Sequence, residues 1–307
     1  MELENGKMWL DGKMLSNEEA KVPFLNPALH YGLAVFEGIR CYDSPKGPAV
    51  FRLKEHLQRF LDSIHIFGVM NMPYDLETLR TATHETVRVN NLRECYIRPL
   101  MYLARGSMGL NIDLMEPSVG IAAWPWGTYL GEEGLRKGVR LLVSSFTRLH
   151  PNVFMTKAKV SGNYVNSVLA KTIASRAGFD ETVMLDPEGY VAECSGENIF
   201  MVRDNVIYTP PKASILEGIT RASLLTIAGD LGYEVVEERI SRDQLYIADE
   251  VFVCGTAAEV VPVREIDFRQ IGIGGRGPVA EALQSAFFDT VHGKGKHSEE
   301  WLDIVDL

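Results

Sequence analysis

Cysteine, long hydrophobic runs and excess positive charge are all scarce in this sequence of 307 residues. The four cysteines lie far apart, without the Cys-x-x-Cys or Cys/His spacings of a zinc site, so we expect free thiols and no bound metal. No hydrophobic stretch approaches the ~18 residues of a membrane span, and the first residues lack the hydrophobic region of a signal peptide. We therefore expect a cytoplasmic protein that contacts no membrane.

The charge balance is acidic, because 41 aspartates and glutamates exceed 31 lysines and arginines to leave a net charge of −10. A phosphate backbone would be repelled by this charge, so nucleic acid is not an expected partner. Hydrophobic residues make up 46% of the chain and charged residues 23%. These proportions are typical of folded proteins and argue against a disordered, collagen-like or coiled-coil chain.

The spacing of hydrophobic residues predicts an α+β protein with two domains. An Asp-Gly pair between hydrophobic residues predicts a hairpin at 8–15. Helices are expected at 51–69, 75–90, 163–177, 220–231 and 278–291, and strands at 94–103, 139–145, 182–186, 198–202, 234–240 and 250–254. Strict strand-helix-strand alternation is absent, which favours α+β. Proline, glycine and aromatic residues predict a linker at 126–136, between an N-terminal α/β domain at 1–125 and a larger C-terminal domain at 137–307.

A glycine-rich segment formally matches the dinucleotide-binding pattern Gly-x-Gly-x-x-Gly. Gly272, Gly274 and Gly277 supply the match, so a nicotinamide-dependent oxidoreductase has to be considered. The pattern is informative only inside a strand-helix-strand unit with an acidic residue about 20 positions further on. The chain ends soon after the following helix, with no second strand predicted. We interpret these glycines as a connector.

Other segments carry residue types suited to chemistry. Lys157 and Lys159 stand beside small residues before a predicted helix, and a lysine amine can form a Schiff base, although a lysine in such a place is usually on the surface. Gly218 and Thr220 occupy the first turn of another helix, where unpaired amides bind phosphate. Thr256 follows a strand in a second turn of small residues. None of these features is specific alone.

Two glutamates lie between predicted strands, Glu193 and Glu197. A carboxylate in a partly buried turn usually caps an amide or pairs with a base. The alternative is an acid that contacts a ring nitrogen, which keeps a pyridine protonated and makes it an electron sink.

Taken together, these segments resemble the fold-type IV pyridoxal-phosphate enzymes, and specifically the branched-chain amino acid aminotransferases. The matching runs occur in order at 28–32, 35–40, 55–59, 96–99, 158–164, 193–200, 218–221 and 255–259. The resemblance implies a two-domain D-amino acid aminotransferase-like fold with pyridoxal 5'-phosphate between the domains. It also implies transamination of leucine, isoleucine and valine with 2-oxoglutarate or L-glutamate by a ping-pong mechanism. A loop at 106–110 that reaches a neighbouring subunit implies a homodimer or a larger homo-oligomer.

The resemblance assigns roles around the cofactor. It implies that Lys159 is the catalytic lysine, which holds the cofactor covalently and moves a proton. Glu193 matches the acid on the pyridine nitrogen, Glu197 takes a supporting position, and Lys157 is read as structural. The remaining cofactor-binding residues implied are Arg59, Gly218, Ile219, Thr220 and Thr256 around the phosphate and Tyr164 at the ring hydroxyl.

The resemblance also implies a substrate pocket, whose residues are Tyr31, Phe36, Arg40, Tyr96, Arg98, Leu110, Trp126, Tyr129, Thr256 and Ala257. Aromatic walls would remove an aliphatic side chain from water. We expect Arg98, with Arg40 as the substitute, to receive the γ-carboxylate of glutamate, because an unpaired charge among aromatic rings would be costly. One departure from some relatives is Glu217 in place of proline, which puts a negative charge beside the phosphate turn.

Alternatives remain within and outside this fold. D-amino acid aminotransferases, (R)-amine transaminases and aminodeoxychorismate lyases share the lysine and the acid, but the runs at 36–40 and 96–98 favour the branched-chain type. A metabolite-binding protein without catalysis is disfavoured by the intact Lys159 and Glu193.

Overall fold

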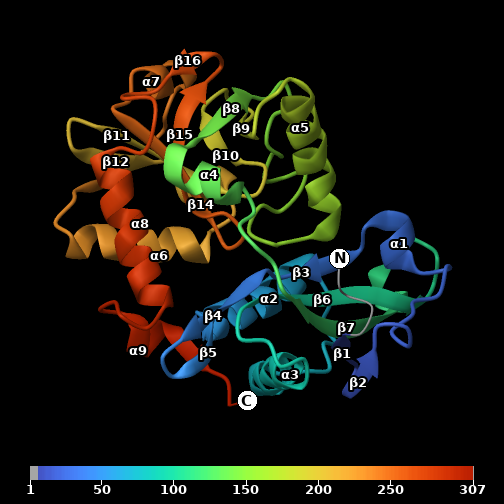
Figure 1. Cartoon of the computed structure of the whole chain (residues 1–307). Helices are drawn as coiled ribbons and strands as arrows, with labels where there is room; N and C mark the ends of the chain where they lie inside the picture. Colours follow the sequence, from blue (N-terminus) through green and yellow to red (C-terminus); the bar gives the residue numbers. More distant parts are fainter. Residues whose placement is uncertain (1–5, 307) are drawn as a thin grey trace. The chain divides into compact units, whose positions relative to one another are not determined.

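The computed structural model describes residues 6–306, which divide into two compact units (Figure 1). The first unit runs to Trp126 and includes the segments 158–162 and 290 onward, whereas the second comprises 127–157 and 163–289. Both segments were expected in the C-terminal domain at 137–307, so the compact units differ from the predicted boundaries. The expected linker at 126–136 contains most of a helix, α4 (Gly131–Lys137).

The first unit is built on an antiparallel sheet, in the order β17-β5-β4-β6-β7-β1-β2, with β3 paired to β6. Its strands are β1 (Lys7–Leu10), β2 (Lys13–Ser16), β3 (Ala34–Phe36), β4 (Ile39–Ser44), β5 (Gly47–Phe51), β6 (Cys95–Gly106), β7 (Met115–Trp124) and β17 (Leu302–Ile304). Its helices are α1 (Pro27–Tyr31), α2 (Leu53–Phe67), α3 (Leu76–Val89) and α9 (Ser298–Trp301), with a 3-10 turn at Ile112–Leu114. The predicted hairpin and the first two predicted helices are confirmed.

Local sequence explains the two long helices of this unit. Leu57, Phe60 and Ile64 lie on one buried face of α2, at the spacing that an amphipathic helix requires. Gly68 ends α2 with φ at 95°, a left-handed conformation that favours glycine. The Asp75 side chain begins α3 by accepting the N–H of Thr78 at 2.9 Å. Helix α2 packs against α3 and β3, and α3 packs against β1 and β7.

The second unit is built on a mixed sheet in the order β10-β9-β8-β15-β14-β11-β12-β13, with β16 paired to β15. Its strands are β8 (Val139–Val143), β9 (Glu181–Leu185), β10 (Val191–Cys194), β11 (Asn198–Arg203), β12 (Val206–Thr209), β13 (Val235–Glu237), β14 (Glu250–Gly255), β15 (Glu259–Ile266) and β16 (Arg269–Gln270). Strand β8 runs parallel to β9 and β15, and β12 runs parallel to β13, whereas the other pairs are antiparallel. This arrangement confirms the α+β prediction.

Helices and turns connect the strands of the second unit. They are α4, α5 (Tyr164–Arg176), α6 (Ile219–Asp230), α7 (Arg242–Tyr246), α8 (Pro278–Val291) and the 3-10 turns at Ser161–Asn163 and Lys212–Ser214. The turn at Ser161–Asn163 straddles the division of the chain, and the last residues of α8 belong to the first unit. Helix α5 packs against β9, α6 against β14 and α4 against β15.

A short segment of five residues, 158–162, belongs to the first unit although residues of the second unit flank it on both sides. The backbone N–H of Lys159 donates to Ser63 Oγ at 3.1 Å, and its carbonyl accepts the N–H of Phe36 at 3.1 Å. The N–H of Gly162 donates to the carbonyl of Gly32. The two backbones lie so close that a Cβ added to Gly32 would be 3.0 Å from the Gly162 Cα. The first unit therefore fixes the backbone of Lys159.

The glycine-rich segment before α8 packs against protein atoms. Glu250 accepts the first amides of the helix, from Val279 at 2.9 Å and from Ala280 at 2.8 Å. A Cβ at Gly277 would collide with the Glu250 side chain, so the glycine is needed for this contact. Because a protein carboxylate already occupies the helix start, the segment offers no place for the pyrophosphate of a dinucleotide.

Two further features concern membranes and metals. No helix within residues 6–306 is long and hydrophobic enough to cross a membrane, and the same residues contain no group of His, Cys, Asp and Glu arranged to hold a metal ion. The four cysteines are free and buried, as expected.

Candidate active site

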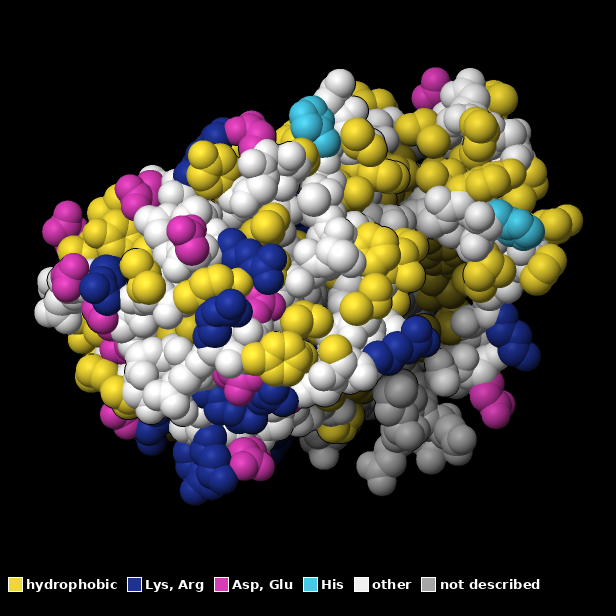
Figure 2. Space-filling model, turned by 90° about the horizontal axis from the view of Figure 1, so that it is seen from above, with side chains coloured by type: hydrophobic (Ala, Val, Ile, Leu, Met, Phe, Trp, Pro, Cys, Tyr) yellow, Lys and Arg dark blue, Asp and Glu magenta, His cyan; other side chains and the backbone are white. Residues whose placement is uncertain are grey.

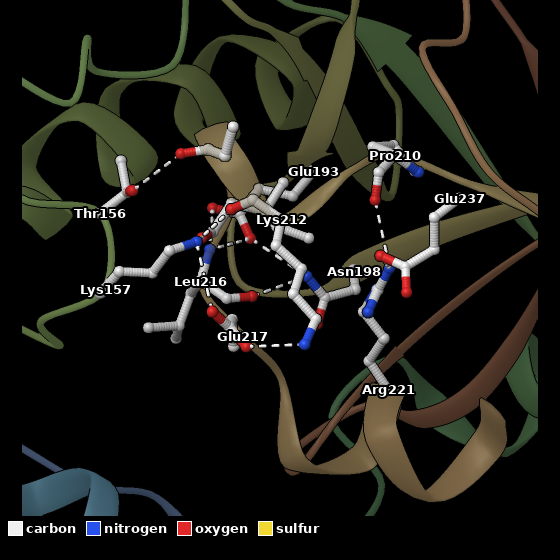
Figure 3. A network of polar contacts seen from close by, with 12 residues as sticks. Thr156, Lys157, Glu193, Asn198, Pro210, Lys212, Leu216, Glu217, Arg221 and Glu237 are labelled. Carbon is white, nitrogen blue, oxygen red and sulfur yellow. Dashed lines mark hydrogen bonds and ion pairs between the residues drawn. The ribbon is translucent and has the colours of Figure 1, made fainter. Parts of the chain in front are cut away.

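Glu193 is the central acid of the second unit. It lies on β10 and is buried, with only 5% of its surface exposed. Arg148 Nε donates to its Oε1 at 2.6 Å, the Leu216 N–H donates to its Oε2 at 3.2 Å, and Asn198 Nδ2 donates to the same oxygen at 3.3 Å (Figure 3 shows the last two). A buried carboxylate needs such partners to replace water. The network holds Glu193 in one position.

The start of α6 offers an anion cradle beside this acid. Gly218 precedes the helix and provides no side-chain cap, so no capping side chain covers the first amides of the helix. A Cβ at Gly218 would collide with the amide of Asn198, whose Nδ2 also donates to the Leu216 carbonyl at 3.1 Å. Ile219 and Thr220 are the first residues of α6. Gly218 therefore lies against Asn198, the partner of Glu193, and the predicted residues Ile219 and Thr220 follow it at the helix start.

Thr256 and Ala257 lie on a second turn that reaches the same region. Asn198 is the register partner of Cys254, so the turn that follows β14 begins beside the start of β11. A Cβ at Gly255 would lie 3.2 Å from the Gly196 carbonyl, which shows how closely the two turns approach. The second unit thus presents a paired carboxylate and two glycine-containing turns. This set fits a ring cofactor that carries both a basic nitrogen and a phosphate.

Tyr164 and Arg221 also belong to the second unit, each in the first turn of a helix. Tyr164 is the first residue of α5. Arg221, in the first turn of α6, is buried and donates to the Pro210 carbonyl at 3.2 Å and to Glu237 at 3.0 Å (Figure 3). Arg221 therefore anchors α6.

In the first unit, Lys159 shares an aromatic ring with Arg98. The Lys159 Nζ lies 4.9 Å from the centroid of the Phe36 ring, and the Arg98 guanidinium carbon lies 4.6 Å from it. Arg98 also lies over the ring of Tyr96, which packs edge-on against Trp126 with centroids 4.6 Å apart. The structure therefore brings these five predicted residues together.

Arg98 has an unmet capacity for hydrogen bonds. Its Nε is buried and has no hydrogen-bond partner, and Nη2 makes only a long contact of 3.4 Å to the Tyr96 hydroxyl. Arg98 forms no ion pair with any residue in 6–306. Arg40, the predicted substitute, instead donates from Nη2 to the Trp126 carbonyl at 3.0 Å. Of the two arginines, Arg98 is better placed to receive a carboxylate.

Arg59 is paired with a buried acid that the sequence did not single out. Its Nε and Nη2 donate to the two oxygens of Glu37 at 2.7 and 2.9 Å, and His56 Nδ1 donates to Glu37 at 2.8 Å. Burial alone would raise the pKa of Glu37, but Arg59 and His56 hold this pKa well below its usual range. Burial lowers the pKa of His56, so the imidazole is neutral at pH 7. Glu37 and Arg59 therefore form the ion pair, which fixes the guanidinium.

Tyr31 and Leu110 lie on exposed parts of the first unit. The Tyr31 hydroxyl donates to the Met108 carbonyl at 2.9 Å, which ties α1 to the loop at 106–110. Leu110 in that loop is 85% exposed. Both predicted residues are therefore exposed within the single chain.

A second buried acidic pair lies near Glu193. Glu181 is fully buried and pairs with Lys171 at 2.5 Å, and Glu197 is buried with the Gly196 N–H donating to it at 3.1 Å. Burial and the nearby Glu181 carboxylate raise the pKa of Glu197 to about 8. The Lys171 ammonium also lies 5.3 Å from the centroid of the Tyr129 ring. Burial therefore favours the protonated form of Glu197, which shares its surroundings with Lys171 and Tyr129.

Several residues of the site had no sequence signal. Arg148 and Glu193 are 45 positions apart, and Arg148 stands in an irregular segment without a motif. Lys171 lies in a helix and Glu181 in a strand, and neither stands in a recognisable motif. His56 and Asn198 did fall within the runs that support the resemblance, and that was the only available hint of their roles.

The chain is similar to known proteins over most of its length. The profile of the family described as Amino-transferase class IV matches residues 34–266. A branched-chain-amino-acid aminotransferase of Pseudomonas aeruginosa is 51% identical over 301 residues, which cover 98% of each chain.

Two solved structures are also similar. The T.th. branched-chain amino acid aminotransferase with pyridoxamine 5'-phosphate has a TM-score of 0.96 and 52% identity, covering 99% of this chain and 100% of that one. The same enzyme complexed with N-(5'-phosphopyridoxyl)-L-glutamate has a TM-score of 0.95 and 50% identity, with the same coverage.

The raised pKa of Glu197 predicts a pH-dependent stability. Its folded pKa of about 8 exceeds the ordinary value of 4.5, so its contribution is fully present below pH 4.5 and is lost as the pH rises through 8. We expect Glu197→Gln, measured by urea denaturation between about pH 5 and pH 8, to lose less stability with rising pH than the unchanged protein. The other titratable groups are the same in both proteins, so their contributions to the pH dependence of stability cancel. Parallel stability curves for the two proteins would contradict the assignment.

Proposed function

Because the chain belongs to the class IV aminotransferase family, we propose that it transfers the amino group of leucine, isoleucine or valine to 2-oxoglutarate and back. The observation that carries the proposal is the buried carboxylate of Glu193, held by Arg148 beside a glycine-lined helix start. A buried carboxylate and an uncapped helix start thereby lie in one unit, and a pyridoxal phosphate enzyme needs an acid for the ring nitrogen and a cradle for the phosphate.

The cofactor is pyridoxal 5'-phosphate. Gly218, Ile219, Thr220 and Thr256 would hold its phosphate through amides and hydroxyls, with Arg59 as the counter-charge. Glu193 would contact the ring nitrogen, Tyr164 the ring hydroxyl, and Lys159 the aldehyde carbon. When bound, this cofactor supplies an electron-withdrawing ring that accepts the electron pair released from the substrate α-carbon.

The residues of the chain supply the remaining chemistry. Lys159 Nζ would take the proton from the substrate α-carbon and, in its protonated form, deliver it to the aldehyde-derived carbon of the cofactor, which is general base and then general acid catalysis. Glu193, fixed by Arg148, Asn198 and the Leu216 amide, keeps a positive charge on the ring nitrogen as negative charge develops nearby. The Phe36 ring lies beside both Lys159 and Arg98, so it helps to limit water around the lysine.

Arg98 would allow one pocket to bind both a hydrophobic and an acidic substrate side chain. Leucine brings a hydrophobic side chain and glutamate an acidic one, and both must enter the same pocket in a ping-pong cycle. The aromatic rings of Phe36, Tyr96 and Trp126 suit the first, and the buried unpartnered Nε of Arg98 suits the second. We assign Arg98 to the γ-carboxylate of glutamate.

A homodimer or a larger homo-oligomer is also proposed. Leu110 is largely in solvent within the single chain, and α5 exposes a row of hydrophobic side chains at helical spacing, namely Val165, Val168, Leu169 and Ile173. Figure 2 shows exposed hydrophobic side chains gathered in groups on the surface. Such groups are typical of subunit contacts. The four buried free cysteines fit a reducing compartment, and we propose the cytoplasm.

An amino-donor panel tests the proposed reaction. The purified protein with pyridoxal phosphate should convert L-leucine and 2-oxoglutarate to L-glutamate and 4-methyl-2-oxopentanoate. D-leucine and (R)-1-phenylethylamine should react at least about a hundredfold more slowly, because the pocket should place only one hand of the α-carbon against Lys159. Lys159→Ala should be inactive with every donor. Preference for D-leucine or for the amine would favour the alternative enzymes of this fold.

Replacing Arg98 should separate the two substrates. We expect Arg98→Met to slow the half-reaction with L-glutamate by about a hundredfold while the half-reaction with L-leucine stays within about fivefold, because only glutamate leaves an unpaired buried charge. Single-turnover absorbance changes measure both. Arg105→Met, on the same strand but exposed, is the control. Equal losses for both donors would place Arg98 on the α-carboxylate or in the scaffold.

A further inference from the structure

Lys157 lies two residues before Lys159 but belongs to the second unit, where its ammonium contacts the segment 212–217. The Nζ donates to the backbone carbonyls of Ile215, at 3.1 Å, and of Lys212 (Figure 3). It also faces the Glu217 carboxylate at 3.6 Å. Thr156 adds a contact of its hydroxyl with the Ala213 carbonyl at 3.5 Å. Thr156 and Lys157 therefore hold the segment 212–217 at several points.

The held segment carries two parts of the proposed cofactor site. Its Leu216 amide donates to both oxygens of Glu193, at 3.3 and 3.2 Å. Two positions later, Gly218 begins α6 and the anion cradle. The backbone from Leu216 to Gly218 thus connects the amide that contacts the proposed ring-nitrogen acid, Glu193, to the proposed phosphate site. A displacement of this segment would disturb both groups together, and effects of this kind on positioning reduce binding and rate strongly.

Glu217 lies between these two parts and faces two lysines, Lys212 and Lys157. Its carboxylate lies 3.1 Å from Lys212 Nζ and 3.6 Å from Lys157 Nζ. Burial would raise the pKa of Glu217, but Lys212 and Lys157 lower it, so the carboxylate is ionised at pH 7. A negative charge next to the helix start opposes a bound phosphate. Both lysines offset that charge, and Lys157 also holds nearby carbonyls of the same segment.

We propose that Lys157 is a positioning residue, which fixes the segment 212–218 and thereby sets both the Leu216 amide against Glu193 and the helix start of α6 for a phosphate. This role rests on the proposed function, because it concerns the pyridoxal phosphate site. An ordinary surface lysine is the competing interpretation, since the Lys157 side chain is 36% exposed. A surface lysine would leave backbone motion and cofactor affinity unchanged.

The test uses the full-length apoprotein and pyridoxal phosphate. Lys157→Met keeps the length and hydrophobic stem but removes every donor. We expect it to raise the dissociation constant of pyridoxal phosphate by about tenfold or more. Hydrogen exchange of the peptide that covers 212–218 should accelerate in the same variant before any cofactor is added, because the carbonyls lose their anchor. Circular dichroism and the unfolding midpoint should stay close to those of the unchanged protein.

Two further variants separate positioning from general damage. Lys157→Arg retains donors and charge and should restore most of the affinity. Lys212→Met removes the other partner of Glu217 but no anchor of a carbonyl, so its dissociation constant should change less than about threefold. If Lys157→Met does not fold, Lys157→Gln, which is too short to reach the carbonyls, takes its place.

The outcomes distinguish this proposal from the proposed function. Wild-type affinity and wild-type exchange in Lys157→Met overturn the positioning role, whatever the enzyme does. Failure of the unchanged protein to bind pyridoxal phosphate overturns the proposed function. The hydrogen exchange of the segment 212–218 would still show whether Lys157 restrains that backbone. An equal loss of affinity in Lys157→Met and Lys212→Met would reduce the effect to the charge of Glu217 and contradict the anchoring of the backbone.

Discussion

The buried carboxylate of Glu193 is the constraint on which the second unit depends. An isolated buried carboxylate is too costly to keep charged, so the chain must bring partners to it from distant positions. Arg148 comes from the irregular segment after β8, Asn198 from the start of β11 and the Leu216 amide from the segment before α6. Meeting that demand places the start of α6 beside the acid. One arrangement of backbone thus satisfies both the need for partners at Glu193 and the need for an anion cradle.

The first unit solves a related problem in a similar way. Glu37 is buried and charged because Arg59 binds both of its oxygens and a neutral His56 donates to it. The pairing limits the directions that the Arg59 guanidinium can take. The segment 158–162 joins this unit through hydrogen bonds to Phe36, Ser63 and Gly32. The proposed catalytic lysine is therefore carried by the unit that contains Phe36, Tyr96 and Arg98, although the residues on either side of the segment 158–162 belong to the other unit.

Local patterns were sufficient to predict some of this structure. The hydrophobic spacing of α2, the Asp75 cap of α3 and the Asp-Gly turn of the first hairpin are written in neighbouring residues. Motif order singled out Lys159, Glu193 and Gly218, whose roles stay predictions. The missing pieces are contacts between distant positions, such as Arg148 with Glu193, Glu37 with Arg59 and Lys171 with Glu181. Their partners share no periodicity, so no window of sequence reveals them. The return of residues after 290 to the first unit is invisible for the same reason.

The role of Glu193 is tested most directly by the half-reaction of Glu193→Gln with L-leucine, monitored through the loss of cofactor absorbance. The amide has the shape of the carboxylate but cannot balance a positive ring nitrogen. We expect the variant to retain bound pyridoxal phosphate and to react at least about a hundredfold more slowly than the unchanged protein. A rate equal to that of the unchanged protein would mean that Glu193 is only a buried structural acid with no role at the ring nitrogen.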